Sequence, residues 1–239
     1  MKAKIAQIYN KILDLFFPKI CEGCGVGGAY ICNSCLNSKV QYVMQHACHV
    51  CKTGVNKGLV HKICGEKTHL DGVFIAAHYS KFLEDFIGDI KYEYYHAMLG
   101  DLVKIMVKGL SLQNGFNDLV SQKDTICTFV PLHPARKRWR GFNQAEKIVQ
   151  GISRHFDIPC QKLLERKKQT HSQMGLPRNK RLANVQGVFS CKKHLDISSY
   201  SSVIIVDDVM TTGTTLEECA LVLRRNGVKS IYGLVCARG

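Results

Sequence analysis

Cysteine is concentrated in one short stretch near the N-terminus. Seven of the 12 cysteines lie within residues 21–64, most of them as Cys-x-x-Cys pairs. The first two pairs are Cys21 with Cys24 and Cys32 with Cys35. Four thiolates at this spacing suit a tetrahedral zinc ion and leave no open coordination position for catalysis. We therefore predict a structural zinc site in a small module, residues 21–70, which unfolds without metal because its own core is small.

A second, incomplete set of metal ligands follows in the same module. Cys48 and Cys51 form a third pair, and Cys64 follows them. Lys67 stands where a cysteine partner of Cys64 is expected. The histidines that could complete this set are His46, His49, His61 and His69. A lone histidine is more often a surface residue than a ligand, so the spacing leaves a second metal ion open.

The first 20 residues have the pattern of a basic amphipathic helix. Its apolar positions are Ile5, Ile8, Ile12, Leu15 and Phe16. Pro18 is expected to end this helix. A basic amphipathic helix can lie on an anionic membrane, but such a stripe more often packs on its own protein. We favour packing and keep a peripheral position at the inner face of the cytoplasmic membrane as the alternative.

Charge and hydropathy narrow the class of protein. The formal net charge is +14, and residues 123–193 hold 16 lysines and arginines against four acids. A field of one sign attracts polyanions such as nucleic acid, an anionic membrane or a phosphate-rich small molecule. No apolar run reaches the ~18–20 residues that cross a bilayer. Because Asp14 interrupts the N-terminal apolar stretch, no secretory signal is predicted, and we expect a soluble cytoplasmic protein.

Apolar strands alternate with amphipathic helices through residues 71–239. The strands are predicted at 73–77, 125–130, 203–206 and 230–236, and the helices at 82–110 (in two pieces), 145–156 and 216–223. Continuous apolar strands separated by helices indicate a parallel sheet with helices on both faces. The predicted fold class is therefore α/β, a parallel sheet flanked by helices and preceded by the Cys-rich zinc-binding module.

Residues 203–215 join a buried strand, two acids and a hydroxyl-rich turn. Asp207 and Asp208 directly follow the strand, and a run of threonines encloses Gly213 before the next helix. Backbone N–H groups at a helix N-terminus attract phosphate, threonine hydroxyls add donors, and glycine permits a close approach. Two carboxylates would repel that phosphate unless they bind hydroxyl groups or a cation. The segment therefore predicts a site for a sugar phosphate and a metal ion, at the carboxyl end of a strand.

This segment resembles the phosphoribosyl pyrophosphate (PRPP) motif of type I phosphoribosyltransferases. In that motif four apolar residues, two acids and two variable residues precede Thr-Thr-Gly-x-Thr. The resemblance implies a type I phosphoribosyltransferase fold that binds PRPP with Mg²⁺. Asp207 and Asp208 would bind the ribose hydroxyls, and the residues after them would hold the 5′-phosphate. The PRPP-binding residues implied in this way are Asp207, Asp208, Val209, Met210, Thr211, Thr212, Gly213, Thr214 and Thr215.

Further motifs identify the chain as a member of the ComF family. Residues 130–134 and 140–145 resemble the first pyrophosphate loop of that family, and Ile90–Tyr92 resembles its Lys-Tyr segment. The matches to its basic loop are Arg166, Thr170, Gln173, Leu176, Arg181, Asn184 and Phe189. The N-terminal zinc cluster matches as well, apart from the incomplete second set. The resemblance implies a part in natural transformation (competence), in which the protein handles incoming single-stranded DNA beside a helicase partner.

PRPP carries a phosphate and a pyrophosphate, so it requires cations on two sides. Guanidinium groups suit the pyrophosphate because they bind phosphate oxygens bidentately. The residues expected at the pyrophosphate and in the basic loop are His133, Arg136, Arg138, Arg140, Lys167, Lys168 and Arg181. Mg²⁺ would bridge the pyrophosphate and the ribose hydroxyls, with mostly ligand oxygens and water around it. In the resembled fold the basic loop corresponds to a mobile hood that closes during transfer.

Trp139 and Phe142 lie among cations and indicate a second kind of ligand. Aromatic side chains in an electropositive groove are typical of single-stranded nucleic acid sites. The residues expected there are Trp139, Phe142, Lys137, Arg178 and Lys180. The alternative for Trp139 is packing against the edge of the sheet.

Two functions remain open at this stage. The first is a PRPP-binding competence protein that handles single-stranded DNA. The second is an active phosphoribosyltransferase that transfers phosphoribosyl from PRPP to a nitrogen acceptor in nucleotide metabolism. Because the same fold can bind without catalysing, we assign no general base and no acceptor.

Overall fold

The computed structural model describes residues 18–92, 96–168, 185–192, 195–197 and 199–239. Most of the predicted N-terminal helix therefore lies outside the described residues. The same holds for the predicted site residues Arg178, Lys180 and Arg181, and for the family matches Thr170, Gln173, Leu176 and Asn184. Across the described part of the chain, no helix is long and apolar enough to cross a membrane.

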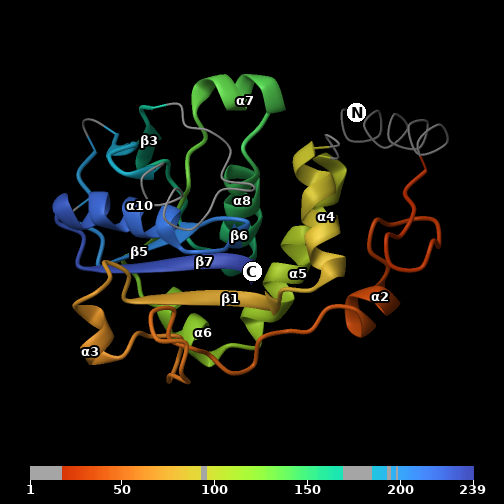
Figure 1. Ribbon diagram of the computed structural model, residues 1–239, viewed down its shortest axis with the longest axis horizontal. Helices are drawn as coiled ribbons and strands as arrows, with labels where there is room; N and C mark the ends of the chain where they lie inside the picture. The colour runs from red at the N-terminus through yellow and green to blue at the C-terminus, as the bar shows by residue number, and fades with distance from the viewer. Residues whose placement is uncertain (1–17, 93–95, 169–184, 193–194, 198) are drawn as a thin grey trace.

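A parallel sheet forms the centre of the molecule (Figure 1). The strand order is β1 (Gly72–His78), β7 (Ser230–Arg238), β5 (Ser202–Val206) and β2 (Thr125–Phe129), and each neighbouring pair is parallel. The two-residue strand β6 (Val209–Met210) follows β5 and pairs with the end of β7. β2 and β5 are buried along their whole length. The predicted parallel sheet is confirmed, and all four predicted strands are present.

Helices cover both faces of this sheet, because its strands are apolar on both faces. In β5, Ile204 belongs to one core cluster, while its neighbours Val203 and Ile205 belong to the other. This alternation is expected of a buried parallel strand. The covering helices are α5 (Leu99–Ser111) and α8 (Gln144–Phe156) in the first cluster and α10 (Thr214–Arg225) in the second.

The predicted helical stretch 82–110 is divided into two helices. These are α4 (Lys81–Tyr92) and α5, with the short 3-10 helix η1 (His96–Met98) directly before α5. Among the described elements of the domain, five more are not predicted: β6, α6 (Asn114–Val120), α7 (Pro134–Arg140), and the antiparallel pair β3 (Leu164–Arg166) and β4 (Phe189–Cys191). None of them exceeds seven residues, which is too short to display a periodic pattern.

The Cys-rich module packs along the outer edge of β1. On this edge the N–H of Val43 donates to the carbonyl of Ala76 at 3.2 Å. The module contains two short helices, α2 (Asn33–Ser38) and α3 (Lys62–Gly65). An uncovered edge strand presents a row of unpaired backbone groups. The module therefore completes the sheet in addition to carrying the cysteine pairs.

Candidate functional site

The hydroxyl-rich turn lies at the carboxyl end of β5, where β6 leads into α10 (Figure 1). Gly213 is the N-cap of α10 and has a φ of 80°, a left-handed conformation that favours glycine. Thr212 Oγ1 lies 3.1 Å from Thr214 Oγ1. The first turn of a helix also has N–H groups without intrahelical partners. We name residues 211–215 the hydroxyl loop. Met210, just before it, buries its side chain and can reach a ligand only through its backbone.

Two acidic residues stand between β5 and the hydroxyl loop. The N–H of Asp207 donates to the carbonyl of Leu234 at 2.9 Å, and the carbonyl of Asp208 accepts the N–H of Cys236 at 2.9 Å. The Asp207 carboxylate accepts the N–H of Asp208 at 2.9 Å, and the Asp208 carboxylate accepts the N–H of Val209 at 2.7 Å. These bonds tie both residues to β7 and fix the direction of two half-buried carboxylates beside the loop.

Arg166 of β3 lies within electrostatic reach of both Arg136 of α7 and Asp207. Burial lowers the pKa of the Arg166 guanidinium, the charge of Arg136 lowers it further, and the charge of Asp207 acts to raise it. The guanidinium also lies 5.3 Å from the centre of the Phe189 ring. Since charges act on each other strongly only at short range, Arg136, Arg166 and Asp207 form one electrostatic group. Such a group suits a ligand with more than one anionic part.

The helix α7 carries a mixture of paired and exposed cations. His133 Nδ1 accepts a backbone N–H two residues along at 3.3 Å and so caps the helix. Lys137 pairs with Glu146 of α8 at 2.7 Å. Arg138 is exposed, and Trp139 is 60% exposed. Trp139 is therefore accessible to a ligand, as the nucleic-acid prediction requires.

Two predicted ligand residues of this region are buried. Arg140 ends α7, and its Nη1 donates to Gln144 Oε1 at 2.9 Å. Gly141 follows with a φ of 78° and turns the chain inwards. Phe142 is consequently only 4% exposed and packs in the core cluster of α5 and α8. The prediction that Phe142 stacks on nucleic acid is wrong, and Arg140 supports the turn between α7 and α8 instead of extending from the surface.

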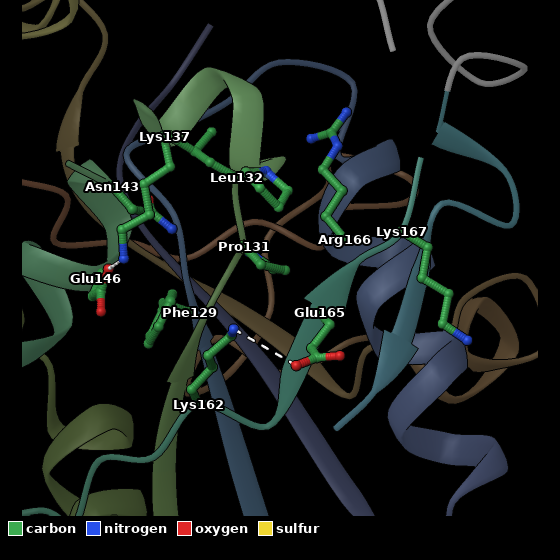
Figure 2. Close-up of a pocket in the computed structure, with 11 residues that line it drawn as sticks. Phe129, Pro131, Leu132, Lys137, Asn143, Glu146, Lys162, Glu165, Arg166 and Lys167 are labelled. Carbon is green, nitrogen blue, oxygen red and sulfur yellow. Dashed lines mark hydrogen bonds and ion pairs between the residues drawn. The ribbon is translucent and has the colours of Figure 1, made fainter. Parts of the chain in front are cut away.

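A pocket of about 290 Å³ lies between α7, the start of α8 and β3 (Figure 2). Its lining is apolar at Phe129, Pro131, Leu132 and Pro134, and all but one of its other residues, the amide Asn143, are charged. The acids of the lining are paired with lysines, since Glu146 contacts Lys137 and Glu165 lies 3.8 Å from Lys162. Arg166 and Lys167 extend from β3 in different directions and give the lining a net positive charge (Figure 2). The pocket adjoins the predicted pyrophosphate loop at 131–134.

The first four cysteines of the module converge on one point. The Sγ atoms of Cys21, Cys24, Cys32 and Cys35 all lie within 4.8 Å of one another, and those of Cys24 and Cys32 are 3.7 Å apart. Tetrahedral zinc–thiolate bonds of ~2.3 Å place sulfurs about 3.8 Å apart, so the cluster fits zinc. Gly23 is required here because a Cβ would lie 2.6 Å from Cys35 Sγ. Burial acts to raise the pKa of the Cys21 thiol, but hydrogen bonds from backbone N–H groups bring it to about 6.

Cys48, Cys51 and Cys64 converge in the same way, and His61 completes the set within 4.8 Å. His61 Nε2 lies 3.1 Å from the carbonyl of Gly54, which can only accept a hydrogen bond, so Nε2 carries the proton. In the neutral ring this leaves a lone pair on Nδ1, which lies 3.3 Å from Cys51 Sγ. A second hydrogen bond that fixes the tautomer in this way is characteristic of metal-ligating histidines. The residues present therefore fit a second tetrahedral metal ion.

The backbone makes the same turn after the first cysteine of each cluster. The N–H of Gly25 donates to the carbonyl of Cys21 at 2.8 Å, and the N–H of Lys52 donates to the carbonyl of Cys48 at 2.8 Å. Both donors are left-handed, with φ values of 76° for Gly25 and 66° for Lys52. A lysine in this conformation is uncommon. Its presence indicates that the second pair forms the same tight turn as the first.

Comparison with known proteins now decides the family. A family model described as "Phosphoribosyl transferase domain" matches residues 143–238, which include the acidic pair and the hydroxyl loop. "Competence protein F" of Haemophilus influenzae is 30% identical over 223 residues, covering 91% of this chain and 90% of that protein. The chain belongs to the competence protein F (ComF) family.

Two further relatives of this ComF-family chain agree with that result. "Competence protein ComFC" of Streptococcus pneumoniae is 25% identical over 202 residues, which cover 84% of this chain and 77% of that protein. "DNA utilization protein YhgH" of Escherichia coli K12 is 35% identical over 105 residues, covering 43% of this chain and 44% of that protein. The parallel sheet with flanking helices is accordingly a phosphoribosyltransferase-like fold.

Two residues of the ComF-family chain gain importance only from the structure. The spacing leaves His61 as one of four alternatives, although His61 and Cys64 repeat the two-residue gap of a Cys-x-x-Cys pair. The fourth ligand of the second cluster is therefore His61, which comes before Cys64. The Cys-x-x-Cys spacing had instead indicated the position after Cys64 that Lys67 occupies. Arg166 matches the basic loop of the family, but only the fold brings it within electrostatic reach of Asp207.

Proposed function

We propose that this ComF-family protein binds PRPP with Mg²⁺ at the hydroxyl loop and acts in competence by handling single-stranded DNA. The observation that supports PRPP most is the meeting of three chemically different groups at one end of the sheet. These are the hydroxyl loop on the N-terminus of α10, the carboxylates of Asp207 and Asp208, and the guanidinium groups of Arg136 and Arg166. PRPP has three matching parts: a 5′-phosphate, ribose hydroxyls and a pyrophosphate.

Each group has one task in this proposal. Backbone N–H groups and hydroxyls of residues 212–215 hold the 5′-phosphate. The carboxylates of Asp207 and Asp208 accept the ribose hydroxyls. The cations that face the pyrophosphate are Arg136, Arg166, Lys167 and Lys168. Mg²⁺, when bound, neutralises part of the pyrophosphate charge and takes oxygen ligands from PRPP, water and the acidic pair.

Titration calorimetry tests this proposal directly. We expect PRPP to bind one-to-one in the presence of Mg²⁺ and to lose most of its affinity when Mg²⁺ is chelated, since a divalent cation offsets the charge of the pyrophosphate. Ribose 5-phosphate is the matched control, because it keeps the phosphate and the ring but lacks the pyrophosphate. It should bind more weakly than PRPP. Equal affinity for both ligands, or no effect of Mg²⁺, would contradict the proposal.

We also propose that both cysteine clusters hold structural zinc. The first cluster supports this with four thiols at tetrahedral spacing, and the second with three thiols and the oriented ring of His61. Four protein ligands leave no position for a reacting water. Zinc in this protein would therefore stabilise the module and not take part in chemistry.

The exposed end of α7 supports single-stranded DNA as a second ligand. Trp139 is 60% exposed, and Arg138 beside it is exposed as well. Lys137 adds a further exposed cation on the same helix. An accessible indole among cations is the combination on which bases stack and phosphates pair. The corresponding role of Phe142 is excluded by its burial.

The salt dependence of binding distinguishes stacking of bases on Trp139 from ionic contacts between phosphates and Arg138. Contact with about four phosphates predicts a slope near −3 for the logarithm of affinity against that of salt concentration. Trp139→Ala should weaken binding of a thymidine oligonucleotide about 5- to 100-fold and leave the slope unchanged. Arg138→Ala should reduce the slope by about 0.7. Lys57→Ala, at an exposed lysine paired with Asp118, is the matched control. A flat salt response would contradict the DNA proposal.

A further inference from the structure

The segment that carries the second cluster contacts α10 through a chain of directed hydrogen bonds. His49 stands between Cys48 and Cys51, and its Nε2 lies 2.9 Å from Thr68 Oγ1. Thr68 Oγ1 in turn lies 2.7 Å from Glu217 Oε2. A carboxylate can only accept, so the Thr68 hydroxyl donates to Glu217 and the His49 ring donates to Thr68. The chain therefore connects a ring between two metal ligands with a carboxylate of α10.

Glu217 is held by the module although it belongs to the helix of the hydroxyl loop. The backbone N–H and the Nδ1 of His69 each lie 2.6 Å from Glu217 Oε1. The N–H of Glu217 donates to the carbonyl of Gly213 at 2.9 Å, so Glu217 stands one helical turn after Gly213. An acid in the first turn competes with a bound phosphate for the positive end of the helix. Because Thr68 and His69 hold the carboxylate, that end is available to a ligand.

Arg238 makes a second connection, on the other side of the loop. Its Nη2 donates to the carbonyl of His49 at 3.1 Å. Arg238 is paired with Met210 in the sheet, and the N–H of Gly239 donates to the Met210 carbonyl at 3.0 Å. The module thus reaches the residue before the hydroxyl loop, Met210, through Arg238, and it reaches Glu217 after the loop through Thr68 and His69.

We infer that metal binding at the second cluster and ligand binding at the hydroxyl loop are energetically coupled through these two connections. The inference rests on the proposed function, in which the ligand is PRPP and the metal is zinc. Such coupling is reciprocal: if PRPP tightens the hold on the metal, the metal tightens PRPP binding by the same factor. Glu217 and Arg238 are positioning residues in this scheme, because they act on the loop without touching the ligand.

Zinc release tests the coupling without any measurement of catalysis. Zinc-loaded full-length protein is brought to equilibrium with increasing concentrations of a colorimetric zinc chelator, with Mg²⁺ present throughout, and the zinc released is measured with and without saturating PRPP. Release from the second cluster is identified as the step that His61→Ala lacks. We expect PRPP to raise the zinc affinity in that step at least about fivefold, the lower end of common coupling factors, and to leave release from the first cluster unchanged.

Variants test whether the hydrogen bonds of Thr68 and Glu217 carry the coupling. Thr68→Val and Glu217→Gln should each reduce the effect of PRPP on release from the second cluster. Glu218→Gln is the matched control, since Glu218 lies in the same helical turn and accepts the N–H of Gly187 instead. It should preserve the effect.

The outcomes distinguish this inference from the proposed function. PRPP binding in calorimetry with unchanged zinc release at equilibrium in the wild-type protein would overturn the coupling and leave PRPP binding intact. A protein that holds zinc only in the first cluster would overturn the coupling as well. Absence of PRPP binding would overturn both proposals together. A wild-type release curve that PRPP leaves unchanged in every step needs no variant to interpret, so that outcome is decisive even where a substitution prevents folding.

Discussion

Replacing Asp207 and Asp208 together with alanine is expected to weaken PRPP binding at least about 100-fold. Each carboxylate is placed to accept a ribose hydroxyl or to approach Mg²⁺, and a hydrogen bond to a charged group contributes about 1.5–3 kcal/mol. Two such contacts give at least about 3 kcal/mol, which corresponds to about 100-fold in the dissociation constant. Titration calorimetry in excess Mg²⁺ measures this change.

Two controls accompany this double variant. The two carboxylates also accept hydrogen bonds from backbone N–H groups, so thermal unfolding must show that the variant remains folded. The pair Asp85→Ala with Asp118→Ala removes the same charge at exposed positions, and its affinity for PRPP should match that of the wild type. Unchanged PRPP affinity in the Asp207 and Asp208 variant would contradict the role of the acidic pair.

Loss of zinc from the first cluster is expected to unfold the part of the module around it. Structural zinc contributes roughly 10–16 kcal/mol to small metal-bound modules, which is comparable to the ~5–15 kcal/mol stability of a whole domain. Cys21 and Cys35 are buried in a core cluster that also includes residues of α5. In the variant Cys21→Ser with Cys24→Ser, hydrogen exchange should become fast in residues 18–40, while β7 remains protected.

Metal analysis of the same proteins separates the two clusters. The wild-type chain should hold two equivalents of zinc, one for each cluster. The Cys21 and Cys24 variant and His61→Ala should each hold one. In His61→Ala, residues 18–40 should remain protected from hydrogen exchange, because His61 belongs to the second cluster. Protection of residues 18–40 in the Cys21 and Cys24 variant would contradict the structural role of the first zinc.

The central sheet and the hydroxyl loop could be predicted because their signals are local. The apolar run Val203–Val206 can satisfy its side chains only between two helical layers, and it is buried on both faces as expected. Asp207, Asp208 and the threonines around Gly213 follow one another in sequence. The strand therefore delivers them to one place without any information about the rest of the fold.

Other parts of the site depend on contacts between distant residues or on single turns. Phe142 and Trp139 are three positions apart, yet the left-handed Gly141 sends one into the core and leaves the other exposed. Glu217 contacts His69, which lies 148 positions away in the sequence. A periodic pattern of apolar residues cannot predict a contact of this kind. The domain bounds expected from the sequence, residues 1–20, 21–70 and 71–239, remain predictions.

The structure of a crystal soaked with PRPP and Mg²⁺ shows whether the hydroxyl loop is the PRPP site. We expect the 5′-phosphate within hydrogen-bond distance of the backbone N–H groups of residues 212–215, the ribose hydroxyls on Asp207 and Asp208, and the pyrophosphate beside Arg136 and Arg166. An empty loop at saturating PRPP, or PRPP bound elsewhere on the protein, would contradict this expectation.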